Sequence, residues 1–236
     1  MADYSGRVVL VTGSSRGVGR LITDHFLGAG AQVIGVARGA SDLQHQNYRH
    51  RQVDVSDATA IQALFVSLRV EGTAVDIVVN NSAVLTSQYA MIMPASAAKS
   101  MVDVNLMAPF LVSREAAKLM RKSKWGRIIN IGSMAARLEP EGDSMYAACK
   151  AALTVLAGVM AKEFASINVT CNTLAITAIE TDMLRQLPRD KIDAVIARLP
   201  IPRYATPDDI LNVIDFFASE RSSYITAQTV FLGGVH

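Results

Sequence analysis

Short apolar runs alternate with helix-like segments along the whole chain, and this alternation is the feature that most restricts its fold. Most of the runs are mainly apolar and rich in β-branched residues, as expected of parallel strands that are covered on both faces, and the third run is shorter and more polar. Their residues are 8–11, 32–36, 50–53, 75–79, 127–131, 169–174 and 229–232. The pattern predicts an α/β fold with one domain over residues 1–236, a Rossmann-type, doubly wound parallel sheet of about seven strands with helices on both faces.

Between the runs, apolar residues recur at the three- and four-residue spacing of helices. The last of these helices has a complete start signal, because Thr206 can cap it, Pro207 opens its first turn and Asp209 follows three residues after the cap. The helix over residues 147–161 is apolar nearly all round although it contains Lys150. We therefore expect this helix to be covered on more than one side.

The composition narrows the class of protein. Only 19% of the 236 residues are charged, against about 25% in an average globular protein. This low charge indicates that part of the surface is hidden, with another subunit of a homo-oligomer as one way to cover it. The net charge of +2 argues against a nucleic-acid or membrane-surface partner. We also expect no signal peptide and no membrane span, since no apolar run approaches about 18 residues.

The two cysteines and four histidines indicate neither a disulfide framework nor a metal site. Cys149 and Cys171 lack the spacing of either, and no pair of histidines has ligand spacing. A reducing, cytoplasmic location is the expectation that fits this cysteine usage.

A glycine-rich loop follows the first run directly and leads into a helix. Residues 12–19 read Thr-Gly-Ser-Ser-Arg-Gly-Val-Gly, with the spacing Gly-x-x-x-Gly-x-Gly. Glycine lets the backbone turn tightly and approach a pyrophosphate, whose charge is stabilised at a helix N-terminus. An ordinary glycine-rich turn is the alternative, but the position in the first strand–helix unit favours dinucleotide binding. The residues expected to bind the cofactor here are Gly13, Ser15, Arg16, Gly17, Val18 and Gly19.

The second run ends without the acidic residue that would bind the ribose hydroxyls of NAD. Residues 36–39 read Val-Ala-Arg-Gly instead. Arg16 and Arg38 are both placed to reach a ribose 2′-phosphate, and each charge-assisted hydrogen bond contributes about 1.5–3 kcal/mol. These residues predict NADPH (NADP+) as the cofactor, the alternative being a pair of solvated arginines.

Ser133, Tyr146, Lys150 and Asn105 form the candidate catalytic set. Tyr146 and Lys150 are four residues apart and share one face of the apolar helix, while Ser133 follows the preceding strand. A nearby ammonium favours the phenolate, and lowering a tyrosine pKa from about 10 to about 7 takes about 4 kcal/mol. We expect Lys150 and a bound nicotinamide cation to supply this stabilisation, so that Tyr146 acts as the acid–base group. Tyr-x-x-x-Lys alone is a weak signal, because any amphipathic helix can contain it. The serine after the preceding strand and the glycine-rich loop upstream make it more specific.

Six motifs occur in a recognisable order along the chain. They are the glycine-rich loop, Asn80-Asn81, Asn105, Ser133, Tyr146-x-x-x-Lys150 and Asn172. This set resembles the short-chain dehydrogenase/reductase superfamily over residues 7–234. The resemblance is closest to the bacterial 3-oxoacyl-[acyl-carrier-protein] reductases, in residues 8–19, 126–133, 179–183 and 224–226. It also implies that the apolar helix packs against its symmetry mate in a dimer within a tetramer.

The resemblance implies a role for each motif residue. Tyr146 would donate a proton to the substrate carbonyl oxygen as hydride arrives from the nicotinamide, and Ser133 would hydrogen-bond to that oxygen. Lys150 would lower the tyrosine pKa and hold the nicotinamide ribose, and Asn105 would position a water that links Lys150 to solvent. Further cofactor contacts would come from Asp54 and Val55 at the adenine, from Asn80, Ser82 and Ala83 along the groove, and from Ile179 and Thr181 near the nicotinamide.

Some positions depart from the family pattern. Residues 80–83 read Asn-Asn-Ser-Ala where Asn-Asn-Ala-Gly is usual, Ile176-Thr177 replaces Pro-Gly, and Ala227 stands where glycine is common. The expected activity is reduction of a ketone, with a 3-oxoacyl thioester linked to acyl carrier protein or CoA as the first candidate. A dehydrogenase of a sugar, polyol or other secondary alcohol and a non-catalytic dinucleotide sensor are the alternatives.

Two further groups of residues admit two interpretations each. Tyr89, Met91 and Met93 would either line an acyl pocket or fill the core. A basic run would complement the dipole of a helix C-terminus, which we favour, or form a docking patch for an acyl carrier protein. The run consists of Lys118, Arg121, Lys122, Lys124 and Arg127.

Overall fold

A computed structural model describes residues 2–180 and 189–235 and contains a seven-stranded parallel sheet. The order of its strands is β3-β2-β1-β4-β5-β6-β7, in which β1 and β4 are neighbours although two strands separate them in sequence. The strands are β1 (Val8–Thr12), β2 (Gln32–Ala37), β3 (Tyr48–Gln52), β4 (Ile77–Asn80), β5 (Gly126–Ser133), β6 (Val169–Ile176) and β7 (Thr229–Phe231). This confirms the predicted fold class.

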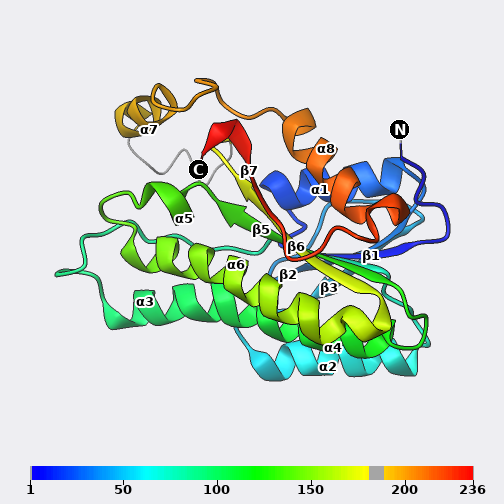
Figure 1. The fold of residues 1–236 in the computed structure, drawn as a ribbon. Helices are drawn as coiled ribbons and strands as arrows, with labels where there is room; N and C mark the ends of the chain where they lie inside the picture. Colours follow the sequence, from blue (N-terminus) through cyan, green and yellow to red (C-terminus); the bar gives the residue numbers. More distant parts are fainter. Residues whose placement is uncertain (1, 181–188, 236) are drawn as a thin grey trace.

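Helices cover both faces of the sheet (Figure 1). They are α1 (Gly17–Gly28), α2 (Ala58–Val70), α3 (Ala95–Val102), α4 (Ala108–Met120), α5 (Ala135–Leu138), α6 (Ser144–Phe164), α7 (Arg189–Ile196) and α8 (Pro207–Ala218). One core cluster joins the sheet to α2, α4 and α6, and a second joins the opposite face to α1 and α8. The doubly wound arrangement follows from strands that are apolar at consecutive positions and so need cover on both sides.

The element boundaries differ from the sequence predictions by one to three residues. The third strand begins at Tyr48 rather than at residue 50, and the fourth begins at Ile77 although Val75 is already buried. The predicted start of α8 is confirmed, because Thr206 and Asp209 form a reciprocal capping box and Pro207 opens the helix.

Helix α6 is the central apolar element of one layer. By length and composition alone, Ser144–Ile167 would be long enough to cross a membrane. Seven residues of α6, including Lys150, are buried, and the helix packs against β5 and β6. These contacts identify α6 as a core helix of the α/β fold.

The crossing from β3 to β4 creates a topological switch point between β1 and β4. In open α/β sheets, ligands bind in the crevice outside the carboxyl ends of the strands at such a point. The loops that follow β1, β4 and β5 therefore meet where a dinucleotide site is expected, and Ser133 ends β5 at the same edge.

Candidate active site

The glycine-rich loop joins β1 to α1 and needs glycine at three positions. Gly13 and Gly17 have positive φ angles of +69° and +56°, which other residues adopt only at a cost. A Cβ atom on Gly19 would lie 2.1 Å from the carbonyl oxygen of Gly13. Only glycine therefore allows α1 to begin this close to the loop.

Thr12 and Asn81 attach this loop to the end of β4. The hydroxyl oxygen of Thr12 accepts hydrogen bonds from the backbone N–H groups of Asn81 and Ser82 at 3.0 and 3.1 Å. The Asn81 amide donates to the carbonyl oxygens of Thr12 and Gly13 at 3.0 and 3.3 Å. Neither residue is among the predicted site residues, although the second asparagine of the Asn-Asn pair was a signal for Asn81.

The N-terminus of α1 is suited to an anion. Arg16 is the N-cap residue, no side chain caps the helix, and its first turn contains no acidic residue. The first N–H groups of a helix lack intrahelical partners and carry partial positive charge. Ser15, Arg16 and Gly17 are at least partly exposed, whereas Val18 packs into the core. The loop and the helix end therefore fit the pyrophosphate of a dinucleotide.

Ser133 and Tyr146 meet beyond the end of β5. The oxygen of Ser133 accepts a hydrogen bond from the N–H of Ala135 at 3.1 Å, so the proton of its hydroxyl remains available for donation. Burial raises the pKa of Tyr146 to about 12, a hydrogen bond with Ser133 acts to lower it, and the charge of Asp143 raises it further. The two hydroxyls thus form a pair that presents protons to a carbonyl oxygen.

Lys150 lies one helical turn after Tyr146 and is only 3% exposed. Its Nζ donates a hydrogen bond to the carbonyl oxygen of Ile131 at 2.7 Å and lies 5.8 Å from the centre of the Tyr146 ring. Burial lowers the pKa of Lys150 to about 8.

The predicted lowering of the Tyr146 pKa by Lys150 and a bound nicotinamide cation stays a prediction. Within the protein, Lys150 is buried and Tyr146 is partly buried, and a low-dielectric environment disfavours the phenolate and the ammonium alike. The net effect on Tyr146 is a pKa raised to about 12. Tyr146 is therefore protonated at neutral pH, which is the state that a proton donor needs.

Asn105 lies in a π-helical turn, Asp103–Met107, between α3 and α4 and is fully buried. Its amide donates to the carbonyl oxygen of Val84 at 2.8 Å and accepts from the N–H of the same residue at 2.9 Å. This reciprocal pair anchors the loop after β4 to the helical layer. Its role in positioning a water stays a prediction.

The protein-family model for the short chain dehydrogenase family matches residues 7–192 of this chain. The chain belongs to the short-chain dehydrogenase family. It is therefore an oxidoreductase that acts on CH–OH groups, with the nicotinamide dinucleotide, NAD or NADP, that is typical of this family.

Curated relatives cover nearly the whole of this short-chain dehydrogenase. The 3-oxoacyl-[acyl-carrier-protein] reductase FabG of Salmonella typhimurium is 34% identical over 238 residues, with 98% of each chain covered. That of Pseudomonas aeruginosa is 33% identical over 241 residues, again with 98% of each chain covered.

Solved structures share the fold closely. A putative gluconate dehydrogenase from Agrobacterium tumefaciens superposes with a TM-score of 0.91 at 29% identity, covering 98% of this chain and 96% of that one. A 4-hydroxyisoleucine dehydrogenase complexed with NADH has a TM-score of 0.91 at 27% identity, covering 97% of this chain and 98% of that one.

At the adenine end of this short-chain dehydrogenase, Arg16 and Arg38 are exposed and neither makes an ion pair within the described residues. Asp54 is also exposed, and its carboxylate accepts hydrogen bonds from the N–H and hydroxyl of Ser56 at 2.9 and 2.8 Å. Both bonds hold the pKa of Asp54 below its ordinary value, and the bond from the backbone N–H of Ser56 has the larger effect. The side chain of Val55 is 6% exposed and packs in the core, so only its backbone is left to face a nucleotide.

Asn80 does not line a groove with its side chain, contrary to the prediction. It is 3% exposed at the end of β4, and its amide donates to Ser113 at 2.9 Å and to Asn130 at 2.8 Å. The strand alternation explains this, because Asn80 points into the sheet–helix layer while the following residues form the loop. Asn80 is thus a structural residue beneath the site.

Two of the three departures from the family pattern, Ala83 and Ile176-Thr177, fit the backbone of this short-chain dehydrogenase. Ala83 does not have a positive φ angle, so its methyl group creates no strain. Ile176 extends β6 opposite Ser133, and Thr177 is buried against Gly233. Ile179 is partly buried against the second core cluster. The predicted cofactor residue Thr181 lies outside the described residues.

The basic run is not one surface. Arg127 is 1% exposed in β5, where its guanidinium donates to the carbonyl oxygens of Gly126 and Ser219 and lies 4.5 Å from the Trp125 ring. It therefore belongs neither to the C-terminus of α4 nor to an exposed docking patch, and it bonds instead to Ser219, the C-cap residue of α8. Lys118 lies in the last turn of α4 and pairs with Glu115 at 2.7 Å.

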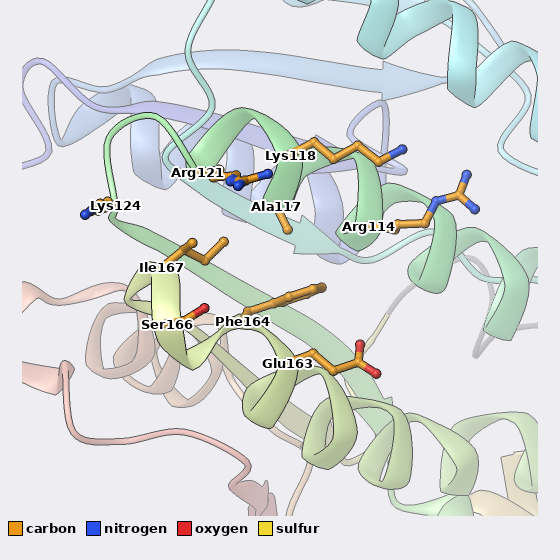
Figure 2. A pocket seen from close by; sticks show the side chains of 9 residues that line it. All are labelled: Arg114, Ala117, Lys118, Arg121, Lys124, Glu163, Phe164, Ser166 and Ile167. Carbon is orange, nitrogen blue, oxygen red and sulfur yellow. The ribbon is translucent and has the colours of Figure 1, made fainter.

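A hollow of about 560 Å³ lies between the C-terminal ends of α4 and α6, and its lining side chains come from both helices (Figure 2). Its residues are Arg114, Ala117, Lys118, Arg121, Lys124, Glu163, Phe164, Ser166 and Ile167. Four cations thus surround a small apolar floor.

Tyr89 and Met91 do not fill the core, because they are 57% and 98% exposed on the loop after β4. The interpretation that these side chains line an acyl pocket stays a prediction.

Proposed function

We propose that this short-chain dehydrogenase reduces a ketone to a secondary alcohol with NADPH. The observation that carries the proposal is the arrangement of Ser133 at the end of β5, Tyr146 in the first turn of α6, where Ser133 acts on its pKa, and a buried Lys150 ammonium one turn along the same helix. Such a set can bind a carbonyl oxygen and deliver a proton to it.

Each residue has one task in this reaction. Ser133 donates its proton in a hydrogen bond to the carbonyl oxygen and stabilises the negative charge that develops there. Tyr146 transfers the phenolic proton to the same oxygen, and the Lys150 ammonium stabilises the phenolate that remains. When bound, the reduced nicotinamide supplies the hydride that the carbonyl carbon receives. The glycine-rich loop and the open end of α1 would hold its pyrophosphate, and Lys150 its nicotinamide ribose.

The choice of NADPH rests on two exposed arginines. Arg16 and Arg38 flank the end of β2, where no acidic side chain occurs in residues 36–39. A guanidinium binds a phosphate in bidentate fashion, and the absence of an acid removes a repulsion. Both features favour a cofactor that carries a 2′-phosphate.

A 3-oxoacyl thioester on an acyl carrier protein is the first candidate substrate. The names of the curated relatives support it, and so does the basic hollow between α4 and α6 (Figure 2). Arg121 and Lys124 make no ion pair within the described residues and so are available to an acidic partner.

A sugar, polyol or other hydroxylated compound is the second candidate. The names of the structural neighbours include a putative gluconate dehydrogenase and an aldohexose dehydrogenase of Thermoplasma acidophilum, the latter at 26% identity and a TM-score of 0.90. The buried carboxylate of Asp143 near Tyr146 favours a hydroxylated substrate as well.

The proposal includes a homo-oligomer in the cytoplasm. Val155 and Val159 are 68% and 48% exposed on the outer side of α6, and Ala148 and Ala151 are exposed on the same side. Burying this stripe against a second copy, in a dimer or tetramer, would cover the apolar helix. The two free cysteines are both buried and fit a reducing compartment.

Oxidation of NADPH with acetoacetyl-CoA and a panel of hydroxyketones tests the proposed function. We expect turnover by the wild type and a loss of at least about a hundredfold in Tyr146→Phe, with unchanged NADPH binding. If no ketone supports turnover while the wild type and Tyr146→Phe bind NADPH equally well, the catalytic proposal is wrong.

A further inference from the structure

Asp143 is a buried acidic residue that the proposed reaction does not use. It precedes α6 as the N-cap residue and is 8% exposed. A carboxylate at this position usually accepts hydrogen bonds from the first turn of the helix, yet the side chain of Asp143 makes no such bond. Its Oδ1 is buried and has no hydrogen-bond partner within the described residues.

The backbone around Asp143 is held firmly. Its N–H donates to the carbonyl oxygen of Pro140 at 3.1 Å, and its carbonyl oxygen accepts from the N–H of Ala147 at 2.7 Å. The segment just before it is attached to the loop after β4, because the N–H of Gln88 donates to the carbonyl oxygen of Gly142 at 2.8 Å. The backbone that carries the carboxylate is therefore fixed by hydrogen bonds, whereas the carboxylate makes none of its own within the described residues.

The position of this carboxylate relative to Tyr146 follows from the start of α6. Asp143 is the N-cap residue and Tyr146 is the third residue of the helix, so both lie in its first turn, and the charge of Asp143 acts to raise the pKa of Tyr146. The buried cation, Lys150, is bonded to the carbonyl oxygen of Ile131 and forms no ion pair with Asp143. No side chain of the described chain thus satisfies the carboxylate, although buried polar groups are nearly always hydrogen-bonded.

A carboxylate accepts hydrogen bonds only, so the missing partner is a donor. A substrate whose carbonyl oxygen is bound by Ser133 and Tyr146 places the adjoining carbon next to the reaction centre. A hydroxyl group on that carbon would donate to Asp143, whereas an anionic group there would be repelled. An apolar group would leave the carboxylate unsatisfied.

We propose that Asp143 is a substrate-binding residue that accepts a hydrogen bond from a hydroxyl group on the carbon next to the reacting one. The substrate is then an α-hydroxyketone, and the product a vicinal diol. This inference rests on the proposed ketone reduction and favours its second candidate substrate class over the 3-oxoacyl thioester.

Two ketones that differ only in this hydroxyl group test the inference. In 1-hydroxy-2-butanone a hydroxyl stands where 3-pentanone has a methyl group. We expect the wild type to prefer 1-hydroxy-2-butanone by about tenfold or more in kcat/KM, since a hydrogen bond to a charged acceptor discriminates by about that factor. In Asp143→Ala the preference should fall below about threefold, and Asp143→Asn should lie between.

The ratio of kcat/KM for the two ketones separates the loss of hydroxyl binding from other effects of the mutation. Removing the charge of Asp143 also changes the environment of Tyr146, but this effect is common to both ketones and cancels in the ratio. Glu141→Gln is the matched control, because Glu141 is an exposed carboxylate on the same loop, and its ratio should equal that of the wild type. Circular dichroism and NADPH binding verify that each variant folds.

Failure of the inference can be told from failure of the proposed function. If the wild type reduces both ketones equally well, or if Asp143→Ala keeps the preference, Asp143 does not bind the hydroxyl, while ketone reduction stands. If neither ketone is reduced, calorimetry on the NADP+ complex compares 1,2-butanediol with 3-pentanol. Tighter binding of the diol that disappears in Asp143→Ala supports the inference, and equal binding overturns it.

Discussion

The Nζ of Lys150 donates a hydrogen bond to the carbonyl oxygen of Ile131 at 2.7 Å, joining the middle of α6 to β5. The contact places a cation inside the protein, where burial lowers the pKa of Lys150 to about 8. Lys150 is thus held close to Tyr146 at a cost in stability, as is common for groups that serve a reaction.

Replacing Lys150 by methionine should stabilise the cofactor-free protein and abolish its activity. The pKa falls from about 10.4 in the unfolded chain to about 8 in the fold, which corresponds to about 3 kcal/mol of destabilisation. This destabilisation is fully present below pH 8 and disappears as the pH rises through the unfolded value. After about 1 kcal/mol for the lost hydrogen bond, urea unfolding at pH 7 should show Lys150→Met about 2 kcal/mol more stable.

At pH 10, Lys150→Met should exceed the wild type in its free energy of unfolding by less than it does at pH 7. Lys162→Met, at an exposed position of the same helix, should change the free energy of unfolding by less than about 0.5 kcal/mol. A wild type that is the more stable protein at pH 7 would contradict the assignment of a strained buried ammonium.

Reduction should become slower above pH 8. Tyr146, with a pKa of about 12, keeps its proton over the accessible range, whereas Lys150, with a pKa of about 8, loses its charge. Since only the charged lysine stabilises the developing phenolate, kcat/KM at saturating NADPH should be level below pH 8 and fall about tenfold for each pH unit above it. A profile that stays level to pH 9.5 would show that another group controls the rate.

Gly19→Ala should destabilise the glycine-rich loop and weaken NADPH binding. The new Cβ would lie 2.1 Å from the backbone oxygen of Gly13 and 2.4 Å from the amide nitrogen of Asn81. Such overpacking costs about 3 kcal/mol in the free energy of unfolding. Gly28→Ala is the control on the same helix, because nothing lies within 4 Å of its added methyl, and it should stabilise the protein by up to about 1 kcal/mol. Equal stability of the two variants would refute the close approach.

Ala227→Gly should stabilise the protein by about 0.5–1 kcal/mol. Ala227 has a φ angle of +60°, a left-handed conformation that costs an L-residue about 1–2 kcal/mol and glycine nothing. The gain is partly offset by the greater freedom of glycine in the unfolded chain. Thermal unfolding checks this, with Ala40→Gly, at an exposed loop position without positive φ, expected to destabilise. A loss of stability in Ala227→Gly would show that the alanine is not strained.

Arg38→Asp should move the cofactor preference toward NADH by about tenfold or more. The variant removes a cation from the end of β2 and introduces an acid that can bind ribose hydroxyls. The ratio of kcat/KM for NADPH and NADH measures the preference. Arg69→Asp makes the same charge change in the last turn of α2, where no cofactor contact is predicted, and should leave the ratio unchanged. An unchanged ratio in Arg38→Asp would remove the basis for choosing NADPH.

The periodicity of the chain was sufficient to derive the parallel sheet, the glycine-rich loop and the spacing of Tyr146 and Lys150. All three depend on local rules: consecutive apolar residues need cover on both faces, a tight turn needs glycine, and residues four apart share a helix face. The start of α8 at Thr206 was equally local and was predicted correctly.

Long-range packing decided the rest. Asn80 bonds to Ser113 and Asn130, Arg127 is buried beside Trp125, and burial raises the pKa of Tyr146 within the protein. The sequence likewise did not predict that the buried Oδ1 of Asp143 lacks a hydrogen-bond partner within the described residues. Each of these depends on how much water a group loses and which distant partner replaces it, and only the folded arrangement of the elements determines both.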